Sequence, residues 1–364
     1  MTSIWDLANP QLRNLGVYEP GKPIDETARE LGIDPRGIIK LASNENALGP
    51  SPKAVLAMRS AIESAQLYPD GSGVYLRDAI AAQLGLKREN VILGNGSNEI
   101  IEFIAHAFLN RSDEVITPQY SFIAYKLVAQ LFDAHTIEPA TIDFRPDLDA
   151  VLSAITPKTK VVFLANPNNP TGSLLEQKEM DAFIERVPDR IITVLDEAYF
   201  EFLENPPDSL RYIRAGRNVI VLRTFSKIHG LASLRVGYAL ARPDVIEVLQ
   251  KTRQPFNVNG IGQIAALAAL GDTPHLEQSK HIVDIGRIYL EEQFRVMKLK
   301  FNPSAANFVF VNVGDGPAVF KKLLGMKIIV RPLGGYNLPE WLRITAGTME
   351  QNEKCIAALK KTLL

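Results

Sequence analysis

Residues 218–227 read Asn-Val-Ile-Val-Leu-Arg-Thr-Phe-Ser-Lys, an apolar run that stops in two hydroxyls and one lysine. The run is rich in β-branched residues, which is typical of a strand covered on both faces in a parallel sheet. Arg235 follows eight residues after Lys227. An ammonium group is not a nucleophile, so a reactive lysine needs a lowered pKa, which desolvation and a nearby cation such as Arg235 supply. An isolated lysine past a strand is usually a surface residue, but two further segments favour the reactive interpretation.

Both of these segments are apolar runs that also end in polar side chains. Residues 161–172 end in Asn-Pro-Asn-Asn-Pro-Thr-Gly, and residues 191–199 end in Asp-Glu-Ala-Tyr. Because ligands bind beyond the carboxyl ends of the strands in open α/β sheets, we expect Asn169, Asp196 and Tyr199 to meet the lysine in one crevice. Taken alone, Asp196 would fit equally well as a helix cap or a turn residue.

These side chains supply the groups that pyridoxal 5'-phosphate requires. A carboxylate such as Asp196 pairs with the protonated pyridine nitrogen and keeps the ring an electron sink, while Lys227 binds the cofactor aldehyde covalently. The amide of Asn169 and the phenol of Tyr199 can hydrogen-bond the phenolate oxygen of the ring. We therefore predict a pyridoxal-phosphate site at the edge of a parallel sheet.

Six motifs occur in order along almost the whole chain. They are Leu41–Asn46, Gly94–Glu99, Asn166–Gly172, Asp196–Tyr199, Thr224–Lys227 with Arg235, and Leu342–Thr345. Together they resemble the motifs of the fold-type I pyridoxal-phosphate aminotransferases, and more narrowly those of the histidinol-phosphate aminotransferase family. The resemblance implies an α/β fold with a mostly parallel seven-stranded sheet sandwiched by helices in a large domain, residues 40–275. A smaller α+β domain would comprise residues 1–39, with an N-terminal arm, and residues 276–364.

A glycine-rich turn, Gly94–Glu99, joins an expected strand to an expected helix. Glycines let a backbone approach an oxyanion, and the amides at a helix N-terminus hold it. The nucleotide-binding pattern Gly-x-x-x-x-Gly-Lys is absent from the sequence, so we interpret Ser97 and Asn98 as backbone donors to the cofactor phosphate. Tyr120 ends the strand that begins at Glu114, and we expect it to stack on the pyridine ring.

Further contacts to the phosphate follow from the resemblance. The hydroxyls of Thr224 and Ser226 would hold it together with Arg235, whose planar guanidinium suits oxyanions. Tyr68 would reach the phosphate of the neighbouring subunit, so the resemblance implies a homodimer. The alternative for Tyr68 is a buried tyrosine with a satisfied hydroxyl.

The resemblance also implies a substrate pocket. Arg343 would bind the anionic group of the substrate and Arg331 would assist it, whereas a surface salt bridge is the alternative for Arg331. Asn44 would border the pocket. Tyr18 belongs to an extended Pro/Gly-punctuated arm, which would lie over the active site or form a simple surface strap.

Composition narrows the class of protein. The chain has 364 residues, 46% of them hydrophobic and 22% charged, as in ordinary globular proteins. Its 40 basic and 41 acidic residues form no long run of one sign, so we expect no nucleic-acid or membrane partner. The five histidines lack ligand spacing, which argues against a metal site. A lone cysteine, Cys355, fits a reducing compartment, and we expect a cytoplasmic protein.

Two arginines suit a dianionic phosphate better than one, which favours histidinol phosphate as the amino donor and 2-oxoglutarate as the acceptor. The segment Val330–Tyr336 also resembles relatives that act on aromatic amino acids, so an aromatic amino acid aminotransferase is the first alternative. A decarboxylase resembling the threonine-phosphate enzyme is the second. A non-catalytic regulator has little support, because every chemical position is filled.

Overall fold

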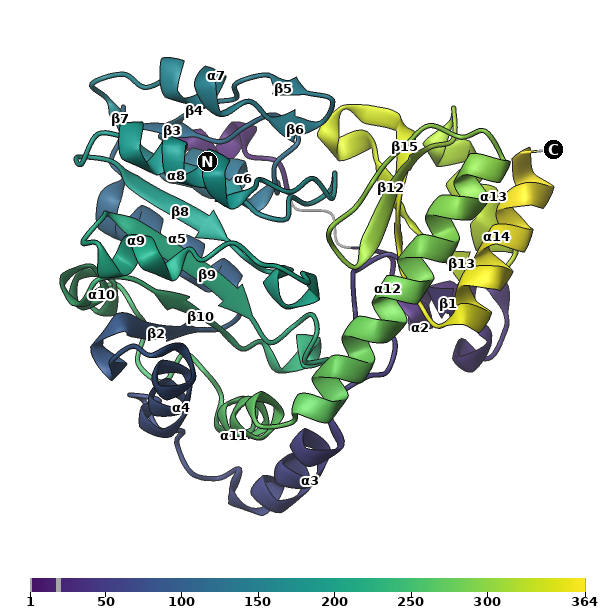
Figure 1. The fold of residues 1–364 in the computed structure, drawn as a ribbon, viewed down its shortest axis with the longest axis horizontal. Helices are drawn as coiled ribbons and strands as arrows, with labels where there is room; N and C mark the ends of the chain where they lie inside the picture. The colour runs from purple at the N-terminus through teal and green to yellow at the C-terminus, as the bar shows by residue number, and fades with distance from the viewer. Residues whose placement is uncertain (1, 18–20, 364) are drawn as a thin grey trace.

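The computed structural model describes residues 2–17 and 21–363, in which helices and strands alternate (Figure 1). The strands are β1 (Ile39–Lys40), β2 (Val91–Gly94), β3 (Glu114–Ile116), β4 (His135–Ile137), β5 (Thr141–Ile142), β6 (Arg145–Pro146), β7 (Thr159–Ala165), β8 (Ile192–Asp196), β9 (Val219–Thr224), β10 (Gly237–Leu240), β11 (Phe301–Asn302), β12 (Phe308–Asn312), β13 (Ile328–Ile329), β14 (Arg331–Leu333) and β15 (Leu338–Thr345). The α-helices are α1 (Ile4–Leu7), α2 (Ile24–Leu31), α3 (Pro52–Ala61), α4 (Val74–Leu84), α5 (Ser97–Phe108), α6 (Ala124–Leu131), α7 (Leu148–Ser153), α8 (Gln177–Arg186), α9 (Leu210–Arg214), α10 (Pro243–Gln250), α11 (Gly260–Leu270), α12 (Thr273–Val296), α13 (Gly316–Gly325) and α14 (Met349–Leu363). The 3-10 helices are η1 (Pro10–Asn14), η2 (Pro35–Gly37), η3 (Ile62–Ser64), η4 (Arg88–Asn90), η5 (Phe200–Phe202), η6 (Ala232–Leu234) and η7 (Gly334–Tyr336).

The central sheet confirms the predicted fold class. Within the described residues it has seven strands in the order β2-β10-β9-β8-β7-β3-β4. The pairs from β9 to β4 are parallel, whereas β10 is antiparallel to both of its neighbours. The exception has a simple cause, because the chain returns from β9 to β10 through residues 225–236 without a crossover helix, and a parallel connection requires one.

Two apolar cores cover the two faces of this sheet. On one face α3, α4, α8, α9 and α11 pack against the strands, and on the other α5, α6 and α10 do so. In β9, Val221 belongs to the first core, whereas Ile220 and Leu222 belong to the second. A strand buried on both faces needs apolar side chains at every position, so the unbroken apolar runs of the sequence became central strands.

A second sheet packs beside the first at the ends of its strands. It has the order β11-β12-β15-β14 and is covered by α12, α13 and α14, while β1 pairs with β13 in a separate parallel ribbon. The core of this part also contains Tyr199 and Ile228. It therefore closes over the strand ends that carry the lysine motif.

The long helix α12 runs between the two parts of the molecule (Figure 1). It extends from Thr273 to Val296, and Pro274 is accommodated in its first turn. The division into domains at residues 39/40 and 275/276 stays a prediction. Among the described helices, none is long and apolar enough to cross a membrane.

Candidate active site

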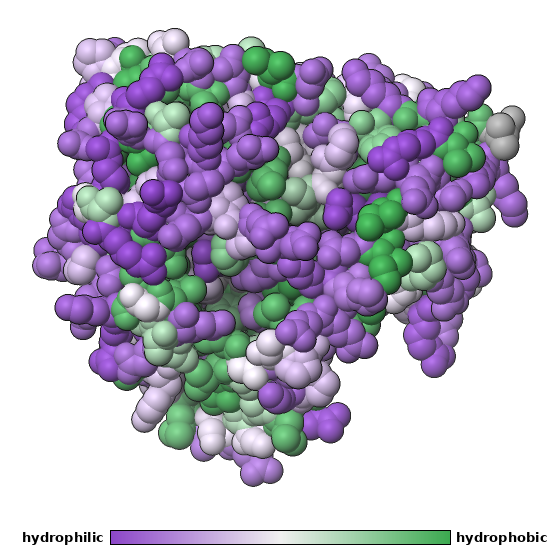
Figure 2. Space-filling view, viewed as in Figure 1, coloured by the Kyte–Doolittle hydropathy of each residue, from purple (hydrophilic) through white to green (hydrophobic). Residues whose placement is uncertain are grey.

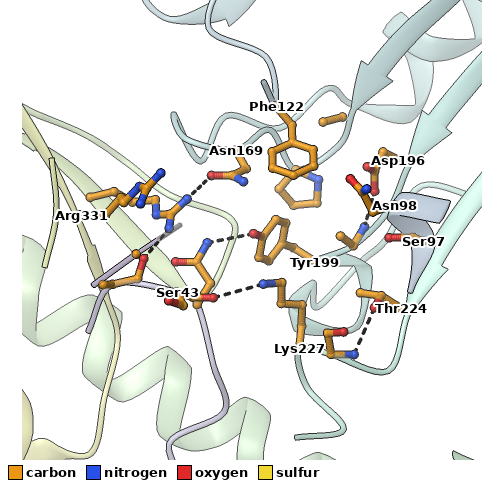
Figure 3. A pocket seen from close by; sticks show the side chains of 18 of the residues that line it. Ser43, Ser97, Asn98, Phe122, Asn169, Asp196, Tyr199, Thr224, Lys227 and Arg331 are labelled. Atoms are coloured by element: carbon orange, nitrogen blue, oxygen red, sulfur yellow. Dashed lines mark hydrogen bonds between the residues drawn. The ribbon is translucent and has the colours of Figure 1, made fainter. Parts of the chain in front are cut away.

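A pocket lies where the carboxyl ends of β7, β8 and β9 face the second sheet (Figure 3). Its position follows from topology, since parallel strands end at the same edge of a sheet. The pocket brings together twelve of the residues that the sequence singled out: Asn44, Ser97, Asn98, Asn169, Asp196, Tyr199, Thr224, Ser226, Lys227, Arg235, Arg331 and Arg343.

Lys227 is half-buried, and its Nζ donates a hydrogen bond to the carbonyl oxygen of Ser43 at 3.2 Å. Burial, together with the positive charges of Arg343 and, less strongly, Arg235, lowers the pKa of this lysine to about 8. The sequence had pointed to Arg235 as the neighbouring cation, but Arg343 contributes more. A lowered pKa gives Lys227 a substantial fraction of neutral, nucleophilic amine near neutral pH.

Asp196 is buried at the end of β8, where two donors hold its carboxylate. The Tyr125 hydroxyl donates to Oδ2 at 2.7 Å, and the backbone amide of Ala198 donates to Oδ1 at 3.1 Å. Burial raises the pKa of Asp196 despite these hydrogen bonds, because desolvation disfavours the carboxylate. A buried carboxylate in this setting suits a ligand that presents a cationic N–H group.

A cup for an oxyanion forms at the N-terminus of α5. Gly96 has φ +78°, and a Cβ atom built there would lie 2.4 Å from Nη2 of Arg235. A Cβ atom at Gly237 would lie 2.2 Å from the backbone nitrogen of Ser97. Two glycines are therefore needed to bring a guanidinium and a helix N-terminus together, as phosphate binding requires.

Hydroxyls complete the cup on the β9 side. The Ser226 hydroxyl accepts a hydrogen bond from Arg235 Nη1 at 3.3 Å, and the Thr224 hydroxyl accepts one from the Ser226 amide at 3.1 Å. This cup fits the phosphate of pyridoxal phosphate. In the same pocket, the buried carboxylate of Asp196 fits the ring nitrogen of the cofactor, and the amine of Lys227 fits its aldehyde.

Arg343 and Asn44 also line the pocket, on the side of the second sheet. Arg343 is buried, and it donates through Nη1 to Asn169 Oδ1 and through Nη2 to the carbonyl oxygen of Ala42. The Asn44 amide donates to the Tyr199 hydroxyl at 2.8 Å, and burial raises the pKa of Tyr199 to about 12. The phenol of Tyr199 is therefore protonated at neutral pH.

Tyr120 does not take the expected place. Among the described residues that line the pocket, the aromatic side chains on the α6 side are Phe122 and Tyr125. The left-handed backbone at Tyr120, φ 58°, turns its ring away to Phe144, with ring centroids 5.5 Å apart. The sequence has three aromatic residues in this stretch, Tyr120, Phe122 and Tyr125. They follow the end of the strand, so the alternation of side chains along a strand does not predict which ring faces the pocket.

Tyr68 lies outside the pocket of its own chain. Its side chain is 83% exposed and stacks on Phe256, with ring centroids 4.9 Å apart. The alternative of a buried tyrosine is therefore wrong. Tyr18, the expected contact from the N-terminal arm, lies outside the described residues.

Comparison with known proteins identifies the class of enzyme to which the chain belongs. Residues 36–359 match the family described as aminotransferase class I and II. A crystal structure of histidinol-phosphate aminotransferase from Sinorhizobium meliloti in complex with pyridoxal-5'-phosphate has a TM-score of 0.89 and 28% identity, covering 98% of this chain and 97% of that one. The fold and the site are those of a pyridoxal-phosphate-dependent aminotransferase.

Two curated relatives narrow the family. The histidinol-phosphate aminotransferase of Akkermansia muciniphila is 48% identical over 99% of this chain and 100% of its own length. That of Moorella thermoacetica is 48% identical over 95% of this chain and 90% of its own. The chain belongs to the histidinol-phosphate aminotransferases within the class I and II family.

Proposed function

We propose that this enzyme transfers the amino group of L-histidinol phosphate to 2-oxoglutarate, giving imidazole acetol phosphate and L-glutamate in histidine biosynthesis. The observation that carries the choice of donor is the pair Arg331 and Arg343, which line one pocket from adjacent strands. Two guanidinium groups offer a dianionic phosphate more complementary charge than a single carboxylate needs. The names of the curated relatives support the same donor.

Lys227 and Asp196 have different roles in the proposed reaction. When bound, pyridoxal phosphate supplies an aldehyde for the amino group and a ring that accepts electrons from the substrate's Cα. Lys227 Nζ holds the cofactor before turnover and afterwards removes the proton from Cα as a general base. Asp196 keeps the ring nitrogen protonated.

Polar side chains orient the ring between these two groups. The Tyr199 hydroxyl and the Asn169 amide would hydrogen-bond the phenolate oxygen of the cofactor. Ser97, Asn98, Thr224, Ser226 and Arg235 anchor its phosphate. Asn169 also accepts from Arg343, so the group that orients the ring is tied to the group that binds the substrate.

The test of the donor is a comparison of kcat/KM for histidinol phosphate and phenylalanine. Phenylalanine represents the first alternative, an aromatic amino acid aminotransferase, which Phe122 and Tyr336 in the pocket favour. We expect histidinol phosphate to have the higher value, and a clear preference for phenylalanine would reverse the assignment. Carbon dioxide as a product would instead indicate a decarboxylase that uses the same lysine.

We also propose that the enzyme is a homodimer in which Tyr68 reaches the cofactor phosphate of the partner subunit. Exposed apolar side chains surround Tyr68 on α4 and α11 and on the loops that precede these two helices, in a region where hydrophobic residues gather in Figure 2. They include Leu67, Tyr75, Phe256 and Ile264. Such patches mark interaction surfaces.

Subunit complementation tests this arrangement. Tyr68→Ala and Lys227→Ala chains are each expected to be nearly inactive as homodimers. A mixed dimer contains one site with both Tyr68 and Lys227 intact, so mixing and re-forming dimers restores part of the activity. If mixing restores none while native mass spectrometry shows that mixed dimers form, Tyr68 acts within its own subunit.

We infer a cytoplasmic location from the one cysteine. Cys355 is buried as a free thiol, which suits a reducing compartment. Fractionation of cells that express the enzyme at native levels tests this, and recovery from an oxidising compartment would contradict it.

A further inference from the structure

We propose that Tyr125 is a positioning residue that holds Asp196 as an oriented carboxylate and so keeps the cofactor's ring nitrogen protonated. This inference rests on the proposed role of Asp196, and it assigns a function to a side chain that the sequence did not single out. Tyr125 lies on α6, and its hydroxyl donates to Asp196 Oδ2 at 2.7 Å across 71 residues of sequence. One hydrogen bond therefore ties a helix to the end of β8.

The ring of Tyr125 is held in a single orientation. It is fully buried and stacks on Phe163 of β7, with centroids 4.6 Å apart and planes 6° from parallel. A second aromatic contact is with Phe122, whose ring is nearly perpendicular to it at 5.7 Å. A hydroxyl on a ring fixed in this way cannot swing to another acceptor, so Asp196 is constrained with it.

The electrostatics make Tyr125 a permanent donor. Burial, together with the charge of Asp196, raises the pKa of Tyr125 well above its ordinary value, so the phenol keeps its proton. The other groups that act on the carboxylate are the Ala198 amide, Glu197 and Lys227. Burial and Glu197 raise the pKa of Asp196, whereas Tyr125, Ala198 and Lys227 lower it.

Removal of this donor makes Asp196 more basic. In the pair formed by a carboxylate and a ring N–H group, a more basic carboxylate draws the proton to itself, and the ring loses its positive charge. The expected effect on turnover is a lower kcat with little change in KM, because the Cα proton is removed less easily once the ring accepts electrons less well.

The experiment uses holoenzyme reconstituted with pyridoxal phosphate labelled with nitrogen-15 in the ring, and compares the wild type with Tyr125→Phe. The nitrogen shift reports ring protonation directly and does not depend on which amine is the substrate, so it stands apart from the choice of donor. We expect a pyridinium shift in the wild type and a shift toward neutral pyridine in Tyr125→Phe. The kcat is expected to fall about tenfold or more, the size of a lost hydrogen bond to a charged group.

Tyr212→Phe is the matched control. Tyr212 is also buried, and its hydroxyl donates to Asp181 Oδ1 at 2.8 Å. Tyr212 lies on α9 and Asp181 on α8, and neither residue lines the pocket. Ring protonation and kcat should be unchanged in this variant. In an Asp196→Ala background, Tyr125→Phe should cause no further loss of kcat, because the group through which it acts is gone.

A second replacement, with the opposite expected effect on ring protonation, distinguishes the proposed role from a folding defect. Placing 3-fluorotyrosine at position 125 keeps the size of the ring and strengthens the hydroxyl as a donor, so ring protonation should persist to higher pH than in the wild type. The proposal is overturned if the ring nitrogen of Tyr125→Phe stays protonated as in the wild type. It is also overturned if Tyr212→Phe shows the same loss, or if the fluorinated protein moves in the direction of Tyr125→Phe.

Discussion

Arg331 and Arg343 are direct partners across the antiparallel strands β14 and β15. Residues directly opposite on such strands project their side chains from the same face of the sheet, and both arginines line the pocket. Two like charges in one site repel each other unless an anion lies between them. The sheet register therefore supports the proposal that the substrate carries a group with two negative charges.

Substitution of Arg331 should discriminate between donors. Arg331→Gln should lower kcat/KM for histidinol phosphate about tenfold to a hundredfold, as expected for lost hydrogen bonds to a charged group. The loss for phenylalanine should be smaller, because one carboxylate is satisfied by Arg343. Steady-state kinetics with both donors checks this. Arg36→Gln, which changes an exposed arginine, is the control, and equal losses for the two donors would contradict the assignment.

The pKa of Lys227 predicts how the cofactor-free protein reacts with pyridoxal phosphate. Only the neutral amine attacks the aldehyde, so the rate should rise with pH and level off above about pH 8, the pKa of Lys227 in the folded protein. Stopped-flow absorbance of the lysine-linked form measures it. Lys227→Ala should show neither this absorbance nor turnover.

The same lysine links pH to stability. Its pKa in the folded protein is about 8, below its ordinary value of 10.5, so between these values the unfolded chain binds more protons. The contribution of this group to the free energy of unfolding therefore rises with pH across that window. Arg343→Gln should raise the midpoint of the rate profile, since the charge of Arg343 is the largest cause of the lowered pKa after burial. An unchanged midpoint would rule out this coupling.

Gly96→Ala should damage the phosphate cup. The new Cβ atom would lie 2.4 Å from Arg235 Nη2 at a backbone φ of +78°, so the guanidinium has to leave its position. We expect the affinity for pyridoxal phosphate to fall at least about tenfold through the displaced ionic contact. Gly216→Ala separates the causes, because Gly216 has φ +77° with open space around it. It should lower the free energy of unfolding by about 1–2 kcal/mol without changing cofactor affinity.

Much of the site could be predicted from the sequence because it lies at strand ends. Lys227, Asp196 and Asn169 each follow an apolar run, and the topology of a parallel sheet alone brings such positions together. Arg343 and Arg331 were predicted through resemblance, whereas their opposition depends on a register shift between Pro332 and Leu333 that no pattern reveals.

The aromatic residues mark where sequence reasoning stops. Tyr120 and Phe122 occupy a loop in which neither the strand nor the helix period applies, and the left-handed backbone at Tyr120 decides which ring faces the pocket. Tyr125 resembles an ordinary core residue of an amphipathic helix. Its contact with Asp196 joins elements distant in sequence, so only the folded structure reveals it.

A buried ion pair behind the strand ends should contribute strongly to stability. Arg223 on β9 contacts Glu197 at 2.8 Å, both side chains are 4% exposed, and the guanidinium lies 3.7 Å from the ring centroid of Phe200. Arg223→Met leaves a buried carboxylate without its cation, so the free energy of unfolding in urea should fall by about 3–5 kcal/mol.

The double variant Arg223→Met with Glu197→Leu should recover most of that loss, because the unpaired charge is removed along with its partner. The exposed pair Arg88 and Asp78 provides the comparison, since Arg88→Met should cost less than about 1 kcal/mol. If the double variant is as unstable as Arg223→Met alone, the loss comes from packing around Phe200, and the buried charge is not its cause.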